Sequence, residues 1–304
     1  MSASTSEPWW PSRYGADDEL GSLNEITPAK VIAAARLIRT GAVYDLGRTL
    51  DANVPRFEGR FWQQTLVSSA HFINGRRPGS DAGGWGRNRL NWITELVNGT
   101  FQIGTQIDGL NHLQIGDRFY NGWRAMDIVE EWGTNKLGVE KVPPVVTRGI
   151  LVDVARHRKV PRLEPGEVVT VDDVDAILRS QGLTVERGDV VLFHTGWGAL
   201  WETDPVRFTS GEPGAGMAVA QWLVEHRVAM TGADTWSFGA VPGEDPERPF
   251  LVPQTLNVRH GLFIMENLDT EVLARAEASE FMFVLTHHKT RGSTAAVIAP
   301  AAVT

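Results

Sequence analysis

The stretch that decides how this chain folds spans residues 101–112 and reads FQIGTQIDGLNH. Side chains in a β-strand alternate between its two faces, so residues two apart share a face. A strand over Phe101–Asp108 therefore places Gln102, Gln106 and Asp108 on one face, and Gly104 leaves room above the backbone between them. Three side chains that can offer oxygen atoms would thus lie along one strip.

His112 follows this strip after a turn at Gly109, and the turn allows its imidazole to fold back over the polar face. A carboxylate, two amides and an imidazole at one strand end predict either a metal site or a polar substrate pocket. The plainer interpretation is a solvent-facing strand of an antiparallel sheet. Two features argue against it: a mid-strand glycine weakens a strand unless something approaches closely, and histidine is the common acid or base near neutral pH.

Working outward, strands and helices alternate along the second half, which is typical of an α/β protein. Short apolar runs at Arg148–Val154 and Asp189–His194 predict buried strands. A helix over Val171–Gln181 is predicted with Thr170 as its cap and Gly182 as its stop. Further strands are predicted at Val43–Leu50, Val228–Gly232, Val258–Glu266 and Phe281–Leu285, and further helices at Lys30–Arg39, Met126–Trp132, Gly214–Arg227 and Leu268–Ala278.

The chain shows no linker or repeat, so we expect a single domain over residues 1–304 with an N-terminal arm of about residues 1–40. The glycine-rich loop at 74–88 is expected to be either a flap that carries Trp85 or a solvated insertion. Eleven tryptophans indicate a large core or an aromatic pocket.

Composition excludes several classes of protein. The 304 residues are 42% hydrophobic and 22% charged, as in ordinary soluble proteins. The absence of cysteine rules out disulfide frameworks, thiolate zinc sites and cysteine nucleophiles. A net charge of −8 without a basic run argues against nucleic acid as a partner. No apolar stretch approaches the roughly 18 residues of a membrane helix, and no signal peptide is visible, so we expect a cytoplasmic protein.

The segment at 101–112 resembles the signature of the metal-dependent cyclase family, which includes bacterial kynurenine formamidase and isatin hydrolase. That signature is His-x-Gly-Thr-His-x-Asp-x-Pro-x-His, and its first two histidines and its aspartate bind the metal. The chain retains Gly104, Thr105, Asp108 and His112. It departs from the signature at Gln102, Gln106 and Leu110, which replace the two histidines and the proline.

The resemblance continues in the family's order from residue 15 to about residue 300. The segments that carry it are Gly15–Asn24, Gly188–Trp197, Gly232–Trp236 and Gly261–Leu268. The last of these contains Glu266, which matches the glutamate that reaches the site in the family. By the same resemblance, Asp234 and Trp236 are expected to line the pocket.

The resemblance implies a swivelling β/β/α fold, with a mixed sheet and flanking helices. It also implies a hydrolase that acts on an amide C–N bond or a lactone in a small cyclic or aromatic compound. In family terms a metal-bound water attacks the carbonyl and His112 moves the proton, with Glu266 as a second carboxylate. A further family histidine is missing near Pro253 and Gln254, which argues against a two-metal site.

The resemblance makes Gln102, Gln106 and Asp108 the metal ligands. Imidazole suits zinc, whereas carboxylate and carbonyl oxygens suit magnesium, calcium and manganese. We therefore expect a weakly held divalent ion, with manganese ahead of zinc. Two alternatives stay open. One is a metal-free cyclase or lyase in which Asp108 orients His112 as a base, and the other is a non-catalytic protein that binds a small molecule.

Expectations about partners rest on the resemblance. Relatives are commonly dimers or larger, so we expect a homodimer or homotetramer that binds a small-molecule substrate, with no nucleic acid and no membrane. Trp9 and Trp10 of the arm are the expected contact with a neighbour. Among the other histidines, His287 and His288 would face opposite sides of a strand and could not easily share an ion, and His194 is expected to be structural.

Overall fold

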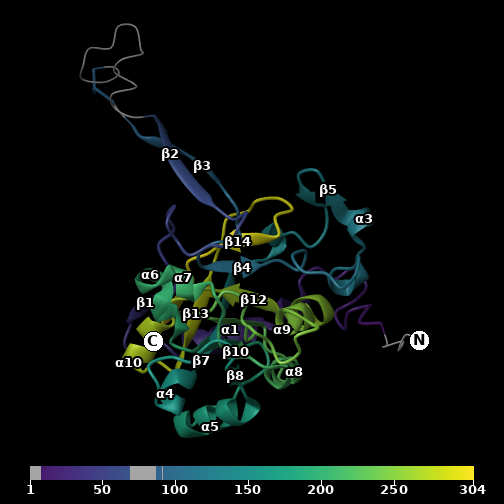
Figure 1. The fold of residues 1–304 in the computed structure, drawn as a ribbon, viewed down its shortest axis with the longest axis vertical. Coiled ribbons are helices and arrows are strands. Elements are labelled where there is room, and N and C mark those ends of the chain that lie inside the picture. Colours follow the sequence, from purple (N-terminus) through teal and green to yellow (C-terminus); the bar gives the residue numbers. More distant parts are fainter. Residues whose placement is uncertain (1–7, 69–86, 91) are drawn as a thin grey trace.

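A nine-stranded mixed sheet forms the centre of the computed structural model, which describes residues 8–68, 87–90 and 92–304 (Figure 1). The strands lie in the order β1-β15-β13-β7-β9-β11-β12-β4-β14. Their bounds are β1 Val43–Asp45, β4 Gln106–Asp108, β7 Val145–Asp153, β9 Val190–His194, β11 Met230–Ala233, β12 Phe263–Glu266, β13 Glu280–Leu285, β14 Ala295–Val297 and β15 Ala301–Val303. Strands β7, β9, β11 and β12 run parallel, and the flanking strands pair antiparallel. The mixed α/β fold is confirmed.

The parallel strands are buried on both faces, which is why they read as continuous apolar runs. Every residue of β9 is buried. Neighbouring residues on one strand enter different hydrophobic clusters: Leu151 and Leu192 belong to one, and Val152 and Val191 belong to the other. The runs predicted as buried strands therefore mark the middle of the sheet.

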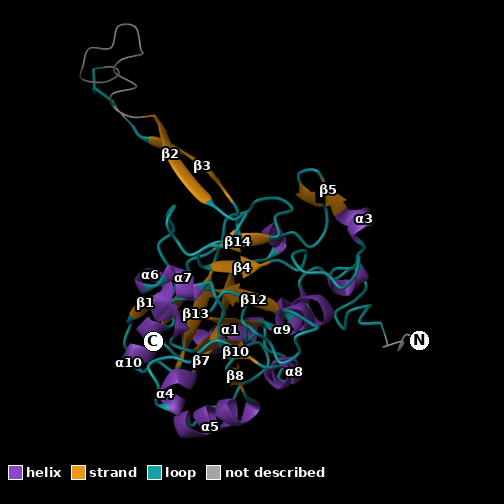
Figure 2. Cartoon of the chain, viewed as in Figure 1, coloured by secondary structure: helices purple, strands orange, loops and turns teal. Residues whose placement is uncertain are grey.

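Helices surround the sheet (Figure 2). The side chains of α5 (Val171–Gln181) and α8 (Met217–Glu225) pack into one cluster, and those of α10 (Glu271–Ala276) pack into the other. In α5, Thr170 accepts the Asp173 N–H at 3.2 Å while the Asp173 carboxylate accepts the Thr170 N–H at 2.9 Å. This reciprocal cap and the left-handed Gly182 fix both helix ends where the sequence predicts them.

The remaining helices are short. They are η1 Gly21–Glu25, α1 Pro28–Ala35, η2 Tyr120–Gly122, α3 Ala125–Ile128, η3 Val139–Lys141, α4 Val154–Arg158, η4 Trp197–Ala199, α6 Leu200–Thr203, α7 Pro205–Phe208, α9 Leu251–Gln254 and the π-helix η5 Thr255–Arg259. Two small sheets pair β5 Val129–Glu130 with β6 Gly133–Thr134 and β8 Val168–Val169 with β10 Gly214–Ala215. In the described part of the chain, no helix is both long enough and apolar enough to span a membrane.

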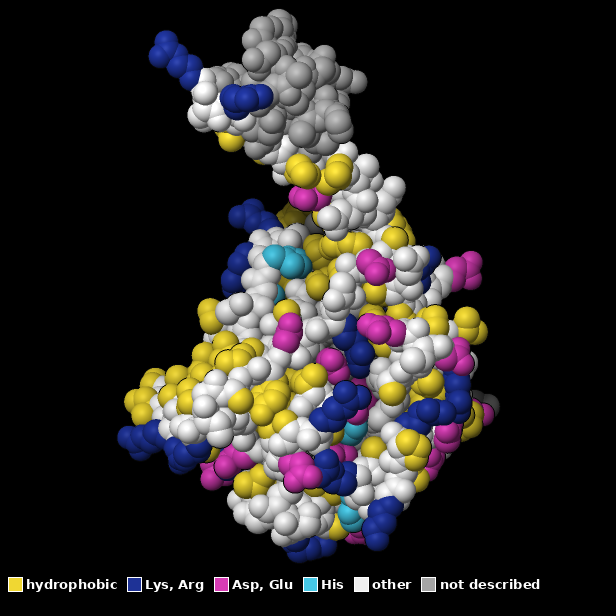
Figure 3. All heavy atoms as spheres, turned by 90° about the vertical axis from the view of Figure 1, so that its left-hand side faces the viewer, with side chains coloured by type: hydrophobic (Ala, Val, Ile, Leu, Met, Phe, Trp, Pro, Cys, Tyr) yellow, Lys and Arg dark blue, Asp and Glu magenta, His cyan; other side chains and the backbone are white. Residues whose placement is uncertain are grey.

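A hairpin of β2 (Trp62–Ser68) and β3 (Thr94–Gly99) stands away from the body (Figure 1). Every residue of β3 is exposed, and Figure 3 shows hydrophobic side chains on this projecting part. These two strands are not among those predicted from the sequence. The expected flap residue Trp85 lies outside the described residues.

Several predicted elements are too long. The predicted strand over 43–50 ends at Asp45, whose carboxylate accepts the Gly47 N–H at 2.8 Å and turns the chain. The predicted strand over 101–108 begins only at Gln106, because Gly104 has φ +65° and breaks the extended backbone. The helix predicted at 126–132 stops at Ile128, where β5 begins. Gly104 thus shapes the backbone and does not simply leave space over a strand.

Candidate functional site

Gln106, Asp108 and Glu266 form one buried polar cluster, which we call the acid cluster. Strand β4 pairs with β12, and Gln106 lies directly opposite Glu266. Asp108 is two residues further along β4 and therefore shares the face of Gln106. The Gln106 Nε2 group donates to Asp108 Oδ1 at 3.2 Å and to Glu266 Oε2 at 2.9 Å. The amide thereby bridges the two carboxylates.

The amide oxygen of Gln106 has no hydrogen-bond partner within the described residues, although it is buried. A buried polar atom left unpaired costs about 1–3 kcal/mol. A water molecule, a substrate group or a cation that reached this oxygen would therefore be stabilised there.

Burial raises the pKa of Glu266 well above its ordinary value, and the charges of Asp108 and Glu212 raise it further, while Arg60 opposes them. Two neighbouring carboxylates in a dry site resist carrying two negative charges. Binding of a proton or of a positive charge therefore stabilises the acid cluster.

His112 lies beside this cluster and is oriented by Gln102. Its Nδ1 atom is 3.2 Å from Gln102 Nε2, which also donates to Thr294 Oγ1 at 2.7 Å. In the neutral tautomer that accepts from Gln102, the proton resides on Nε2. The metal-free alternative assigns the orientation of His112 to Asp108, but among the described residues the hydrogen bond to His112 Nδ1 comes from Gln102 and none comes from Asp108.

A cavity of about 320 Å³ brings Asp108, Glu266 and His112 together. Its wall is largely aromatic and apolar, and the remaining lining residues are Phe57, Arg60, Leu113, Trp236, Ser237, Phe250 and Pro253. The Phe57 ring lies 4.6 Å from the Trp236 ring, and Trp236 lies 6.1 Å from Phe250. An apolar wall with a few polar groups is typical of a small-molecule site.

Residues 44–240 match the family described as "Putative cyclase". The chain belongs to the cyclase family. A crystal structure of a novel cyclase superposes with a TM-score of 0.86 at 29% identity, over 96% of this chain and 98% of the other. Isatin hydrolase A from Ralstonia solanacearum gives a TM-score of 0.63 at 19% identity, over 92% and 98%. A predicted metal-dependent hydrolase from Bacillus stearothermophilus gives 0.53 at 16%, over 87% and 98%.

The likeness to these last two proteins concerns the fold alone. No curated protein sequence matches this cyclase-family chain.

Glu212 supports the cavity wall of this cyclase-family protein from behind. It is fully buried and accepts the Trp236 N–H at 2.6 Å, the Ser237 N–H at 3.0 Å and the Ser237 hydroxyl at 2.5 Å. Burial raises the pKa of Glu212 well above its ordinary value, against the effect of these donors. The carboxyl group thus fixes the two residues that present the indole of Trp236 to the cavity.

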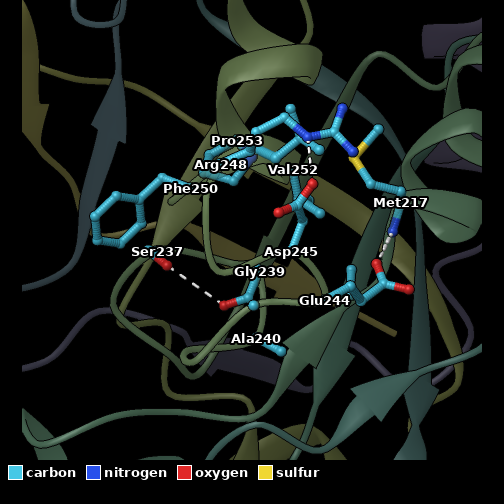
Figure 4. A pocket seen from close by; sticks show the side chains of 13 residues that line it. Met217, Ser237, Gly239, Ala240, Glu244, Asp245, Arg248, Phe250, Val252 and Pro253 are labelled. Carbon is cyan, nitrogen blue, oxygen red and sulfur yellow. Dashed lines mark hydrogen bonds and ion pairs between the residues drawn. The ribbon is translucent and has the colours of Figure 1, made fainter.

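A much smaller hollow of about 30 Å³ lies behind the same wall (Figure 4). Ser237, Phe250 and Pro253 line both spaces. An ion pair of 2.6 Å between Arg248 and Asp245 borders the hollow. The hollow has room for little more than a water molecule, so the larger cavity is the candidate substrate site.

Other predicted candidates have structural contacts. Trp236 lines the cavity as expected, but Asp234 lies outside its lining and accepts from Thr195 Oγ1 at 2.7 Å. His194 is buried and its Nδ1 lies 2.8 Å from Thr270 Oγ1. His287 lies 3.1 Å from the Val142 carbonyl oxygen. These contacts place Asp234, His194 and His287 in the framework of the fold.

The predicted ligand set is divided in the structure. Gln102 contacts His112 and Thr294, whereas Gln106 and Asp108 join Glu266. No group of three or more His, Cys, Asp or Glu side chains in the described ranges could hold a metal ion. The oxygen donors that do meet are those of the acid cluster, and their roles as ligands stay predictions.

Sequence reasoning missed Phe57, Arg60, Phe250 and Glu212. Phe57 and Arg60 precede the hairpin and Phe250 precedes α9, so all three come from connecting segments. No periodic pattern marks such residues. A fully buried glutamate has no sequence signal either, since its burial depends on distant chain segments.

Proposed function

We propose that this protein is a hydrolase that opens an amide C–N bond or a lactone in a small aromatic or cyclic compound. The observation that carries the proposal is the union of Asp108, Glu266 and His112 in one aromatic cavity. The volume of about 320 Å³ suits a small ligand. Membership of the cyclase family and the fold shared with isatin hydrolase A support the same class of reaction.

The proposal includes a divalent cation as cofactor. The unpaired buried oxygen of Gln106 beside two carboxylates offers hard oxygen donors, which suit manganese, magnesium or calcium better than zinc. Asp108, Glu266 and Gln106, after a turn of its amide, would hold the ion, and manganese is the one we expect. Such an ion supplies Lewis-acid activation of the substrate carbonyl and of water.

The chain's own residues handle the proton. With its proton on Nδ1 and the Gln102 amide turned to accept it, the imidazole of His112 can take a proton from the attacking water at Nε2. The imidazolium then returns that proton to the departing nitrogen or oxygen as the acyl bond breaks. Arg60 lines the same cavity and places positive charge where the carbonyl oxygen becomes negative. The aromatic wall of Phe57, Trp236 and Phe250 excludes water around the scissile bond.

A metal-free cyclase or lyase is the second candidate, and one observation favours it. The Gln106 N–H group already bridges Asp108 and Glu266, where a cation would require oxygen donors around it. In this case Asp108 and Glu266 share a proton, and His112 transfers protons without a bound ion.

Metal analysis of purified protein, paired with turnover before and after chelation, tests the two candidates. The substrate panel would contain aryl formamides, isatin-like lactams and lactones. The hydrolase proposal expects one divalent ion per chain, loss of turnover on chelation and recovery with manganese. Full turnover in protein shown to be metal-free would establish the second candidate, and ligand binding without turnover would indicate a non-catalytic protein.

Gln106→Leu removes the bridging amide and is expected to lower both metal content and turnover. The matched control is Gln221→Leu, because Gln221 is exposed and, within the described part of the chain, its amide bonds Glu225 alone, at 2.9 Å. Unchanged metal content in Gln106→Leu would exclude this cluster as the metal site.

A further inference from the structure

A second cavity, of about 280 Å³, lies beneath the N-terminal segment and shares no lining residue with the acid-cluster cavity. Its walls come from the segment at 8–14, from Ser22 and Tyr120, from the end of α8 and the turn after it, and from the end of η5 and the segment after it. The segment at 8–14 rests on its own chain, since the Arg259 guanidinium lies 5.1 Å from the Trp9 ring centroid and that of Arg118 lies 4.6 Å from Trp10. The expected contact of these indoles with a neighbour stays a prediction.

Positive charge in this cavity is not neutralised. Arg13 and Arg259 both line it, and neither has a carboxylate partner within the described ranges. Arg227 differs, because its guanidinium pairs with Glu25 at 2.7 Å. Two guanidinium groups without counter-charges at one cavity create a site that attracts an anion.

His260 also lines this cavity, and the positive charges of Arg13 and Arg259 act on it. Burial, together with the charges of Arg13 and Arg259, lowers its pKa to about 4. His260 is therefore neutral at pH 7 and offers hydrogen-bonding nitrogens without adding charge. Trp9 Nε1 in the same wall is buried and has no acceptor among the described residues.

The nearby carboxylates do not neutralise Arg13 and Arg259, because each is already bonded to other groups. Glu25 is fully buried and holds Tyr14, Arg187 and Arg227. Asp18 accepts the Tyr120 hydroxyl at 2.7 Å. The cavity thus contains cations and unpaired donors but no free acid of its own.

We propose that this cavity binds a small organic anion. Arg13 and Arg259 hold its carboxylate or phosphate group, and its apolar body packs against Trp9, Val228 and Leu262. Guanidinium groups form paired hydrogen bonds with both kinds of acid. The proposal does not depend on the reaction performed at the acid cluster.

Isothermal titration of the full chain with benzoate and with phenyl phosphate tests the proposal and distinguishes the two acids. Benzamide is the matched neutral probe, because it has the shape of benzoate without its charge. We expect at least one of the two acids to bind with one site per chain and benzamide to bind at least tenfold more weakly. Arg259→Gln and Arg13→Gln should each lower the affinity for the acid roughly tenfold or more.

Arg36→Gln is the control, because Arg36 is an exposed arginine that lines neither cavity and should leave the affinity unchanged. Arg259→Lys keeps the charge and serves if Arg259→Gln does not fold; a partial loss of affinity is expected from it. Absence of binding by both acids, equal binding of benzamide, or full affinity in a folded Arg259 variant would each overturn the proposal.

Discussion

Replacing Glu212 by alanine is expected to destabilise the protein and to loosen the wall of the substrate cavity. The substitution removes the acceptor of the Trp236 and Ser237 N–H groups and of the Ser237 hydroxyl. The hydroxyl can turn to the Gly239 carbonyl oxygen, 3.4 Å away, but the two backbone groups have no second acceptor among the residues that the structure describes.

The magnitude follows from those two orphaned donors. At about 1–3 kcal/mol for each buried unpaired donor, the loss is about 2–6 kcal/mol before any cost of the empty space. For a chain of this size the midpoint of thermal unfolding should fall by about 3–9 °C. Glu212→Gln keeps one acceptor oxygen, so it should lose less than Glu212→Ala.

Thermal and chemical denaturation measure the free energy of unfolding. Turnover measured over a range of substrate concentrations gives KM and kcat, which report on the cavity wall. KM should rise more than kcat falls, because Trp236 and Ser237 line the cavity without taking part in proton transfer. Glu244→Ala is the control: Glu244 is exposed, and the one hydrogen bond it accepts from the described residues is from the Met217 N–H, at 2.7 Å. Wild-type stability together with a wild-type KM in Glu212→Ala would refute the reasoning.

Three further outcomes are expected at the acid cluster and at His112 beside it. Gln106→His should tighten zinc binding in a titration because it adds an imidazole donor, while Asp108→Asn should abolish metal binding; unchanged affinities in both would contradict the proposed site. His112→Ala should lower turnover by roughly 10²–10⁴-fold with metal content intact, and Gln102→Leu should have a smaller effect, whereas a loss of metal in His112→Ala would speak against its role in proton transfer. In chelated protein the free energy of unfolding should fall as pH rises above about 5, because folded Glu266 binds its proton more tightly than the unfolded chain does; Glu266→Gln should flatten that slope, and equal slopes would disprove the assignment.

The sequence predicts the elements whose signals are local. Helix α5 was predicted with its observed bounds because Thr170 and Gly182 act within the helix itself. The buried strands β7 and β9 were predicted because a parallel strand that is covered on both faces is a continuous apolar run in the sequence. The strand predicted before Gln106 was wrong. There Thr105 donates to the distant Asn267 carbonyl oxygen at 2.8 Å, and the alternation of polar and apolar residues cannot show such a contact.

At the candidate site, too, the sequence predicts some features and not others. The family resemblance pointed to Gln102, Gln106, Asp108, His112 and Glu266. The structure brings the last four side chains to one place, and Gln102 contacts His112. It could not show that the amide of Gln106 turns its N–H group toward both carboxylates, since that orientation depends on the pairing of β4 with β12. Arg60 enters the site from a connecting segment with no periodic pattern.

The strand order determines how much of the chain must be synthesised before the acid cluster can form. Strand β4, which carries Gln106 and Asp108, lies between β12 and β14, and β1 pairs with β15. These pairings join chain segments that are far apart in sequence, and such contacts form slowly. During synthesis the acid cluster must therefore wait for Glu266, and the open side of β4 must wait for Ala295–Val297. A nascent chain halted before that strand would present an unpaired edge beside its acid cluster, a template for wrong pairing with another chain.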